Sequence, residues 1–319
     1  MVGPAPGVAC GPTSTHSAIH LNRPRGLVLD RACNLYVADS LGDRVVKVDA
    51  GGRVTVNPAR LRSPRSISAD SRGNVYVGTE DARVLALRPD GSVRSVAGNG
   101  SCSGGAPPSG SADQATVCLP SGLAADGAGN LYIADGANRY VARVSPAGGI
   151  STLAGVGERV SSGDGGPAAL ARIGDPLAIA VDGGGSLYVS DGYSTTVRKI
   201  TAGRISRFAG GGTGNALGPQ PALAADIYPN GLALDARGDL FIADDLHHQV
   251  RKVSRDGVME TVAGTGVPGR SGDQGPAMAA TLRFPQGVAL DADGNLYIAD
   301  TGNDHIRRVA GDGTITTVL

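Results

Sequence analysis

The sequence predicts an all-β fold, a six-bladed β-propeller built from four-stranded antiparallel blades. The first observation is one segment that recurs six times in the 319 residues, from RPRGLVLDRACNLYVAD to FPQGVALDADGNLYIAD. The second is the composition. There are 50 Gly and 19 Pro, and nearly all charged residues are Asp or Arg, which favours short strands and turns over helices. The third is the presence of four short apolar runs in most repeats, the number of strands in a propeller blade.

The repeats divide the chain. Each copy begins near one proline, and successive prolines lie 40 to 56 residues apart, a spacing typical of propeller blades with variable connectors. The six prolines are Pro24, Pro64, Pro120, Pro176, Pro229 and Pro285. We therefore predict a single propeller over residues 23–319. Residues 1–22 form an N-terminal segment that supplies either an extra edge strand or a clasp closing the ring.

Within a repeat the elements follow in a fixed order. A first apolar run ends at an Asp such as Asp30, and a Gly- or Asn-containing turn leads into a second run, as in a β-hairpin. The second run holds one aromatic residue, which we expect to fill the space between neighbouring blades. A third run and a Gly turn lead to the fourth. The aromatic positions are Tyr36, Tyr76, Tyr132, Tyr188, Phe241 and Tyr297.

Charge and hydropathy exclude several classes of partner. Lys plus Arg and Asp plus Glu both number 29, so no overall field favours nucleic acid or an anionic membrane, and no nucleic-acid partner is expected. No apolar run is long enough for a membrane span. The first residues, MVGPAPGVAC, lack the charged and apolar regions of a signal peptide, so we expect any signal or anchor to be absent from this chain.

The repeat resembles the NHL-repeat family of β-propellers, whose unit reads P-x-G-L-A-x-D-x-x-G-N-L-Y-V-A-D. The match runs from about Arg23 to Leu319, and connectors such as SGDQGPAMAA resemble the long-repeat bacterial branch of the family. The resemblance implies the fold more directly than an activity, because family members include sensor modules, protein- and RNA-binding modules and a few metal-dependent lyases.

The predicted channel strands carry no metal ligands. They read GLVL, SISA, GLAA, AIAV, GLAL and GVAL, and all are small or aliphatic. The enzymes that the fold resembles present His, Asn or acidic ligands to a central metal. No cofactor is therefore predicted, and a divalent metal has no support from these inner strands.

A ligand site is predicted on the loop face, where propellers commonly bind their partners. The residues after the repeat prolines are Arg25, Arg65, Ser121, Leu177, Asn230 and Gln286. Arg23, Arg60 and Arg62 would add three guanidinium groups to the same sector as Arg25 and Arg65, where planar forks pair with carboxylate, phosphate or sulfate. The alternative is that Arg25 and Arg65 only bridge neighbouring acidic loops.

An Asp ends five of the six second strands, and we expect it to accept backbone N–H bonds of its own turn. Blade 2 has Thr79 and Glu80 instead, and a blade that departs from the repeat is a candidate for function. The ligand-binding prediction therefore comprises Arg25, Arg62, Arg65, Glu80, Asn230 and Gln286.

Blade 5 contains the loop ADDLHHQV, in which His247 replaces the Asn that the family usually shows. If the protein is an enzyme, acid–base chemistry would fall to the polar residues of these loops. The candidates are His247, His305, Asp245 and Tyr193. The alternative is a structural role, because adjacent His residues tend to point apart and no third metal ligand is evident.

The connectors SGDGGPAALA and SGDQGPAMAA predict a turn that opens a short helix behind a Pro. They lack the oxygen spacing of known calcium loops and the Lys of phosphate loops, so packing of each connector against its blade is the preferred interpretation.

The four cysteines predict two disulfides, Cys102–Cys118 around a connector and Cys10–Cys33 between the N-terminal segment and blade 1. Two disulfides favour a secreted or extracytoplasmic domain, and four unrelated thiols in the cytosol are the alternative.

Two functions follow from these observations. The first is an extracytoplasmic, non-enzymatic propeller that binds a protein or a small anionic ligand at its loop face and channel mouth. The second is a lyase, hydrolase or cyclase with its active site at the channel mouth. A purely structural role within a longer chain is a third alternative.

Overall fold

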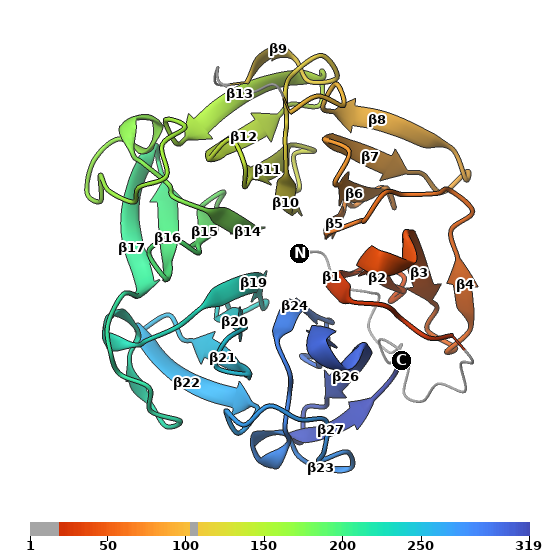
Figure 1. Cartoon of the computed structure of the whole chain (residues 1–319), viewed down its shortest axis with the longest axis vertical. Helices are drawn as coiled ribbons and strands as arrows, with labels where there is room; N and C mark the ends of the chain where they lie inside the picture. The colour runs from red at the N-terminus through yellow and green to blue at the C-terminus, as the bar shows by residue number, and fades with distance from the viewer. Residues whose placement is uncertain (1–18, 103–107) are drawn as a thin grey trace.

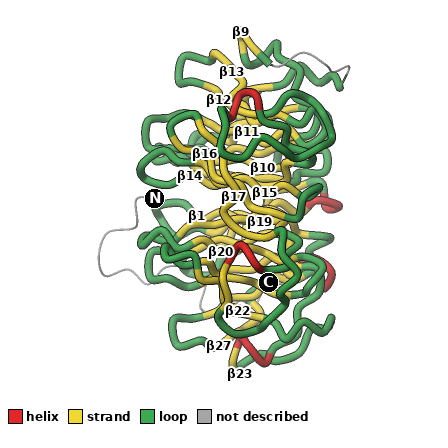
Figure 2. The backbone as a smooth tube through the Cα atoms, turned by 90° about the vertical axis from the view of Figure 1, so that its left-hand side faces the viewer, coloured by secondary structure: helices red, strands yellow, loops and turns green. Residues whose placement is uncertain are grey.

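The computed structural model describes residues 19–102 and 108–319. Six antiparallel sheets surround a central channel, with one inner strand of each sheet at the channel (Figure 1). Loops cover both faces of this ring (Figure 2). The predicted all-β, six-bladed propeller is therefore confirmed. In the part of the chain that the structure describes, no helix has the length and apolar character needed to cross a membrane.

The first three blades come from residues 24–154. Blade 1 contains β1 (Pro24–Leu29), β2 (Leu35–Asp39), β3 (Arg44–Val48) and β4 (Val54–Val56). Blade 2 contains β5 (Ser66–Ala69), β6 (Val75–Thr79), β7 (Arg83–Leu87) and β8 (Val93–Ala97). Blade 3 contains β9 (Ser109–Ser111), β10 (Pro120–Ala125), β11 (Leu131–Asp135), β12 (Tyr140–Val144) and β13 (Gly149–Ala154).

The last three blades follow in chain order. Blade 4 contains β14 (Pro176–Val181), β15 (Leu187–Asp191), β16 (Thr196–Thr201) and β17 (Arg204–Gly210). Blade 5 contains β18 (Gln220–Pro221), β19 (Pro229–Leu234), β20 (Leu240–Asp244), β21 (Gln249–Val253) and β22 (Val258–Ala263). Blade 6 contains β23 (Gly275–Pro276), β24 (Pro285–Leu290), β25 (Leu296–Asp300), β26 (His305–Val309) and β27 (Thr314–Thr317). Short 3-10 helices occupy η1 (Ser40–Gly42), η2 (Ala168–Leu170), η3 (Ala222–Ala224), η4 (Ala277–Ala279) and η5 (Thr301–Asn303).

Three blades have five strands rather than the four expected from the repeat. The additional strands are β9, β18 and β23, and each pairs antiparallel with the outermost strand of its blade. These strands come from the long connectors, whose backbone supplies hydrogen bonds to an otherwise open sheet edge. The repeat pattern does not reveal them because they are only two or three residues long.

The turn between the first two strands of a blade is organised by an aspartate. In blade 1, Asp30 accepts hydrogen bonds from the Asn34 side chain at 2.7 Å and from the Tyr36 hydroxyl at 3.1 Å. Blades 2 and 3 repeat both bonds with the same residue types. Burial, together with the neighbouring carboxylate, raises the pKa of Tyr76 and Tyr132 to about 12. The recurring letters D, N and Y thus form one hydrogen-bonded unit.

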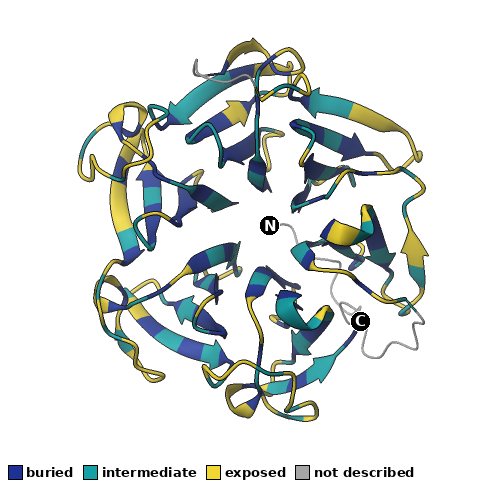
Figure 3. Ribbon diagram, viewed as in Figure 1, coloured by how far each residue is buried: buried dark blue, intermediate teal, exposed yellow. Residues whose placement is uncertain are grey.

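Each repeat aromatic packs against the next blade. Tyr36 of blade 1 contacts a buried cluster that includes Ile67 and Val75 of blade 2. Tyr188 of blade 4 shares a cluster with Leu240 of blade 5. The predicted role of the aromatics as fillers between blades is therefore confirmed. Burial is greatest on the second strands of the blades, such as β11, β15 and β25, in which every residue is buried, and lowest on the outermost strands (Figure 3).

The ring closes between blades 6 and 1, where β24 lies beside β1 (Figure 1). Leu21 is buried in the same apolar cluster as Tyr297 of blade 6. The backbone N–H of Arg23 donates to Oδ1 of Asp304 at 2.7 Å. Residues 21–23 thus contact the last blade. Residues 1–18 of the predicted N-terminal segment lie outside the described residues, so its role as an edge strand or a clasp stays a prediction.

Candidate functional site

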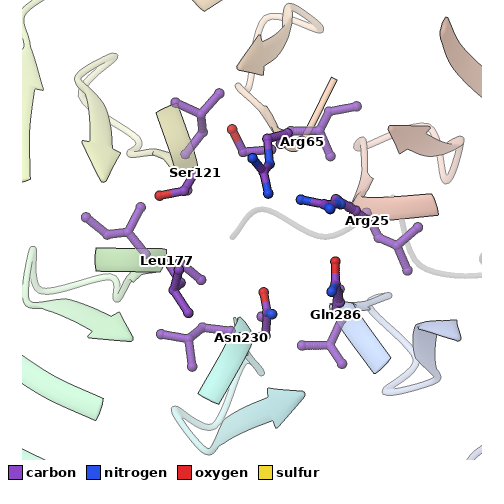
Figure 4. A pocket seen from close by; sticks show the side chains of 18 residues that line it. Arg25, Arg65, Ser121, Leu177, Asn230 and Gln286 are labelled. Atoms are coloured by element: carbon purple, nitrogen blue, oxygen red, sulfur yellow. The ribbon is translucent and has the colours of Figure 1, made fainter. Parts of the chain in front are cut away.

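Six side chains, one from each blade, surround the mouth of the central channel (Figure 4). They line a cavity of about 190 Å³, together with the two residues that follow each of them on the inner strands. The six are Arg25, Arg65, Ser121, Leu177, Asn230 and Gln286. They are the residues after the repeat prolines, so sequence position alone identified this ring.

The repeat prolines fix where these side chains lie. Each proline is buried and sits at the start of the inner segment of its blade. Its carbonyl oxygen accepts a hydroxyl from the preceding blade in several cases, such as Ser66 Oγ to Pro120 at 2.6 Å. Glycine often follows the ring residue because neighbouring inner strands approach closely. A Cβ on Gly287 would lie 2.0 Å from the carbonyl oxygen of Arg25.

Arg25 is a half-buried guanidinium that points into the ring (Figure 4). Burial lowers its pKa from 12.5 to about 10, and the positive charges of Arg65 and Arg23 add to this effect. Its Nε is buried and has no hydrogen-bond partner, and in residues 19–102 and 108–319 no carboxylate forms an ion pair with it. Arg25 therefore presents unused donors at the channel mouth, and the carboxylates of Glu80 and Asp245 act on its charge without forming an ion pair with it.

Arg65 also points into the ring, and it has a partner in its own blade. Its Nη1 lies 3.2 Å from Oε1 of Glu80, whose side chain is 48% exposed. Burial lowers the pKa of Arg65, and the Glu80 carboxylate opposes that shift. The sequence left open that both arginines only form ion pairs with acidic loops. Arg65 does form such a pair, whereas Arg25 forms none within the described residues. An exposed pair of this kind contributes little stability and leaves Arg65 available to a ligand.

Blades 5 and 6 carry two amides and a buried carboxylate, with Asn230 across the ring from Arg65 and Gln286 beside Arg25 (Figure 4). Asn230 Nδ2 donates to Oδ2 of Asp245 at 3.1 Å. Asp245 is 9% exposed, and its Oδ1 has no hydrogen-bond partner among the described residues. Burial raises the pKa of Asp245, while the side chains of Asn230 and Gln286 oppose the rise. Asp245 therefore lies directly beside the ring rather than within it.

The remaining arginines of the predicted sector lie at its edge. The charge of Arg23 acts on both Arg25 and Arg65, which places it near them. Arg62 is exposed, and its backbone oxygen accepts the N–H of Glu80 at 3.0 Å. Arg60 is exposed as well, and neither Arg60 nor Arg62 lines the cavity. Ligand binding by Arg62 stays a prediction.

The four candidate acid–base residues do not line the cavity. His247 is held between two carboxylates, with Nδ1 2.8 Å from Oδ1 of Asp244 and Nε2 3.6 Å from Oδ2 of Asp226. Tyr193 is 51% exposed. His305 begins β26 and has a buried Nδ1 without a hydrogen-bond partner in the described residues. Of the four, Asp245 alone is seen to contact a ring residue.

The aspartates that end the second strands accept backbone N–H groups as expected, but chiefly from the loop that enters the blade rather than from their own turn. All five are buried, and Asp135 accepts the backbone N–H groups of Cys118 and Leu119 at 3.0 and 3.2 Å. The other four likewise accept backbone N–H groups from the loop that enters their own blade. Each aspartate thus ties an interblade loop to its blade and holds the channel mouth in place.

Three buried arginines were not anticipated from the sequence. Arg198, Arg251 and Arg307 occupy the same place in the third strands of blades 4, 5 and 6, and each is at most 1% exposed. Arg198 and Arg307 pair with Asp164 and Asp273 of the SGDGGPA and SGDQGPA connectors at 2.8 and 2.9 Å. The predicted packing of these connectors against the blades is therefore confirmed. The shared sequence signal is an Arg at the third residue of the third strand in blades 4, 5 and 6, where blade 3 has Ala142.

No three His, Cys, Asp or Glu side chains gather in a group suited to a metal ion within the described ranges 19–102 and 108–319. The predicted disulfide between Cys102 and Cys118 is present. The second predicted disulfide involves Cys10, which lies outside the described residues, so that pairing stays a prediction.

Comparisons with known proteins agree with this architecture. The family described as the Teneurin NHL domain matches residues 265–319. Human Teneurin-4 is 30% identical over 227 residues, which cover 62% of this chain and 8% of Teneurin-4. The chain thus spans a small part of the curated relatives that it matches.

Two solved structures share the fold at low sequence identity. An auxiliary nutrient binding protein from Bacteroides thetaiotaomicron has a TM-score of 0.68 at 14% identity, covering 94% of this chain and 70% of that protein. Virginiamycin B lyase from Staphylococcus aureus has a TM-score of 0.59 at 13% identity, covering 94% and 86%. The six repeats, the ring of six blades and the matching family together identify the chain as an NHL-repeat β-propeller.

Proposed function

We propose that this propeller is an extracytoplasmic binding module that holds a small anionic ligand, or an anionic group of a protein, at the mouth of its channel. The observation that carries the proposal is Arg25, a half-buried guanidinium without an ion pair in the described residues, beside the second inward guanidinium of Arg65. Planar guanidinium forks bind carboxylates and oxyanions with two hydrogen bonds each.

The position of the charges supports the same function. A folded protein incurs a free-energy cost when it half-buries two guanidinium groups side by side, and a bound anion would reduce that cost. The cavity of about 190 Å³ suits a small ligand or the end of a larger one. The fold neighbour described as an auxiliary nutrient binding protein supports a binding role for a propeller of this fold.

The Cys102–Cys118 disulfide supports the proposed location, because such bonds persist in oxidising compartments. The enzymatic alternative, a lyase, hydrolase or cyclase, has less support. Its candidate residues do not line the cavity, and His247 is engaged by two carboxylates.

The test is calorimetric titration of the protein with acetate and with selenate. We expect Arg25→Gln combined with Arg65→Gln to weaken binding of both anions at least tenfold, which corresponds to about 1.4 kcal/mol. The matched control is Arg72→Gln, an exposed arginine in the hairpin turn of blade 2. An unchanged affinity in the double variant, or an equal loss in the control, would overturn the proposal.

A further inference from the structure

The channel mouth is chemically two-sided. Blades 1 and 2 present Arg25 and Arg65, whose guanidinium groups only donate hydrogen bonds. Blades 5 and 6 present the amides of Asn230 and Gln286, which either donate or accept according to their orientation. The nature of the ligand therefore depends on which end of each amide faces the channel.

Asp245 sets the orientation of the amides. An ionised carboxylate has acceptors only, so the amide that contacts it must present its NH2 group. Asn230 does so, with Nδ2 3.1 Å from Oδ2 of Asp245. The oxygen atoms of Asn230 and Gln286 are then left toward the middle of the ring, as Figure 4 shows. This side of the mouth offers hydrogen-bond acceptors.

Asp245 is a departure from the repeat. Four other blades have Ser40, Gly136, Gly192 and Thr301 directly after the aspartate that ends the second strand. In blade 6, Thr301 Oγ1 donates to the carbonyl oxygen of Pro24 in the next blade at 2.6 Å. Blade 5 instead buries a carboxylate at this place, and its Oδ1 has no hydrogen-bond partner in the described residues. The negative charge of Asp245 lies behind the amide oxygens of Asn230 and Gln286.

An anion alone does not match this arrangement. Its oxygens would satisfy the guanidinium groups of Arg25 and Arg65 but would also meet the amide oxygens of Asn230, across the ring, and of Gln286, beside Arg25. The amide oxygens require a hydrogen-bond donor from the ligand. A cationic donor is stabilised most, because the buried Asp245 carboxylate lies nearby.

We propose that the mouth binds a small zwitterion of the α-amino acid type, with its carboxylate toward Arg25 and Arg65 and its ammonium group toward the oxygens of Asn230 and Gln286. This inference rests on the proposed function and specifies the class of its ligand. An ammonium group has three N–H donors, enough for both amide oxygens. The cavity of about 190 Å³ is small enough to bring both ends of such a ligand against the ring.

The experiment uses calorimetry to compare L-alanine with the two compounds obtained when one of its charged groups is replaced by hydrogen. L-Alanine carries both charges, propionate lacks the ammonium group, and ethylamine lacks the carboxylate. We expect L-alanine to bind at least tenfold more tightly than propionate, and ethylamine to bind more weakly than either. Asp245→Thr, which introduces the residue that blade 6 uses, should narrow the ratio between L-alanine and propionate. Asp245→Asn keeps the shape of the side chain, removes its charge and should narrow the same ratio. The control Asp256→Asn changes an exposed residue of blade 5 and should leave the ratio unchanged.

The outcomes separate the two proposals. Equal binding of L-alanine and propionate by the wild type, or an unchanged ratio in both Asp245 variants, overturns the zwitterion inference. If propionate binding is nevertheless weaker in the Arg25→Gln, Arg65→Gln double variant, the proposed anion-binding function stands even though the zwitterion inference fails. If propionate binding is independent of both arginines, the proposed function fails as well.

Discussion

His247 takes the place of an asparagine that binds the buried aspartate of its own blade. Its Nδ1 lies 2.8 Å from Oδ1 of Asp244. In blade 6, Asn303 Nδ2 lies 2.8 Å from Oδ2 of Asp300, and blade 3 has the same contact. The spacing is three residues in each blade, so His247 performs a structural task that the repeat assigns to Asn.

The first prediction concerns the pH dependence of stability. The hydrogen bond and charge of Asp244 raise the pKa of His247 above 6.5, with Asp226 adding to the rise and burial and Arg251 opposing it. Protonated His247 therefore stabilises the fold. This contribution is complete below the ordinary pKa and is lost as the pH rises through the raised value.

His247→Asn should remove this pH-dependent stability and leave a well-folded protein at pH 8, whereas His20→Asn, at an exposed position, should not alter the profile. Urea unfolding between pH 5 and pH 8 measures both variants. A His247→Asn profile that matches the wild type would contradict the assignment.

The second prediction concerns the buried arginines. Arg251→Met should lower the free energy of unfolding by about 3–5 kcal/mol, because it removes the guanidinium that lies 3.2 Å from the fully buried Asp244 carboxylate. Arg143→Met, at an exposed position in the third strand of blade 3, should cost far less. Chemical denaturation measures the free energy of unfolding of both variants. A similar decrease in the two would mean that the buried Arg251–Asp244 pair does not stabilise the fold.

The third prediction concerns a strained turn. Thr195 has φ of 52°, a left-handed conformation that is unfavourable for a β-branched residue. Thr195→Asn should raise the free energy of unfolding by about 1 kcal/mol, because Asn tolerates this conformation better. The same change at Thr196, a buried strand residue, should destabilise the protein. A lower thermal midpoint for Thr195→Asn would show that the strain is offset by contacts of Thr195.

The fourth prediction concerns the connector before blade 3. Replacing both Cys102 and Cys118 by Ser opens a loop that the disulfide closes over a separation of 16 residues. The chain-entropy model gives a loss of about 3 kcal/mol for a loop of this length. Guanidinium unfolding measures the loss, and a midpoint equal to that of the wild type would contradict it.

Much of the fold was predictable because the repeat encodes it. In blades 1, 2, 3 and 6 the Asp, Asn and Tyr of the hairpin interact within a few residues of one another, as Asp30, Asn34 and Tyr36 do. The ring of six side chains was predictable for the same reason, since one proline marks the start of each inner strand. The short fifth strands were not, because they depend on connector backbone rather than on a residue pattern.

The side-chain contacts of the site were less predictable from the sequence. Asp245 was considered from the sequence as an acid–base residue, whereas the structure places it behind the amide of Asn230. That contact joins β19 to the loop after β20 across 15 residues, and no local pattern encodes it. The buried state of Arg251 likewise depends on connector atoms 35 and 36 residues away, among them the side chain of Asn215.

The most direct test of the account is anomalous diffraction at the selenium edge from crystals soaked in selenate. The account predicts a selenium peak at the channel mouth within hydrogen-bond reach of Arg25 and Arg65, and no such peak in crystals of the Arg25→Gln, Arg65→Gln double variant. Selenate bound only elsewhere on the protein, with the mouth empty, would contradict it.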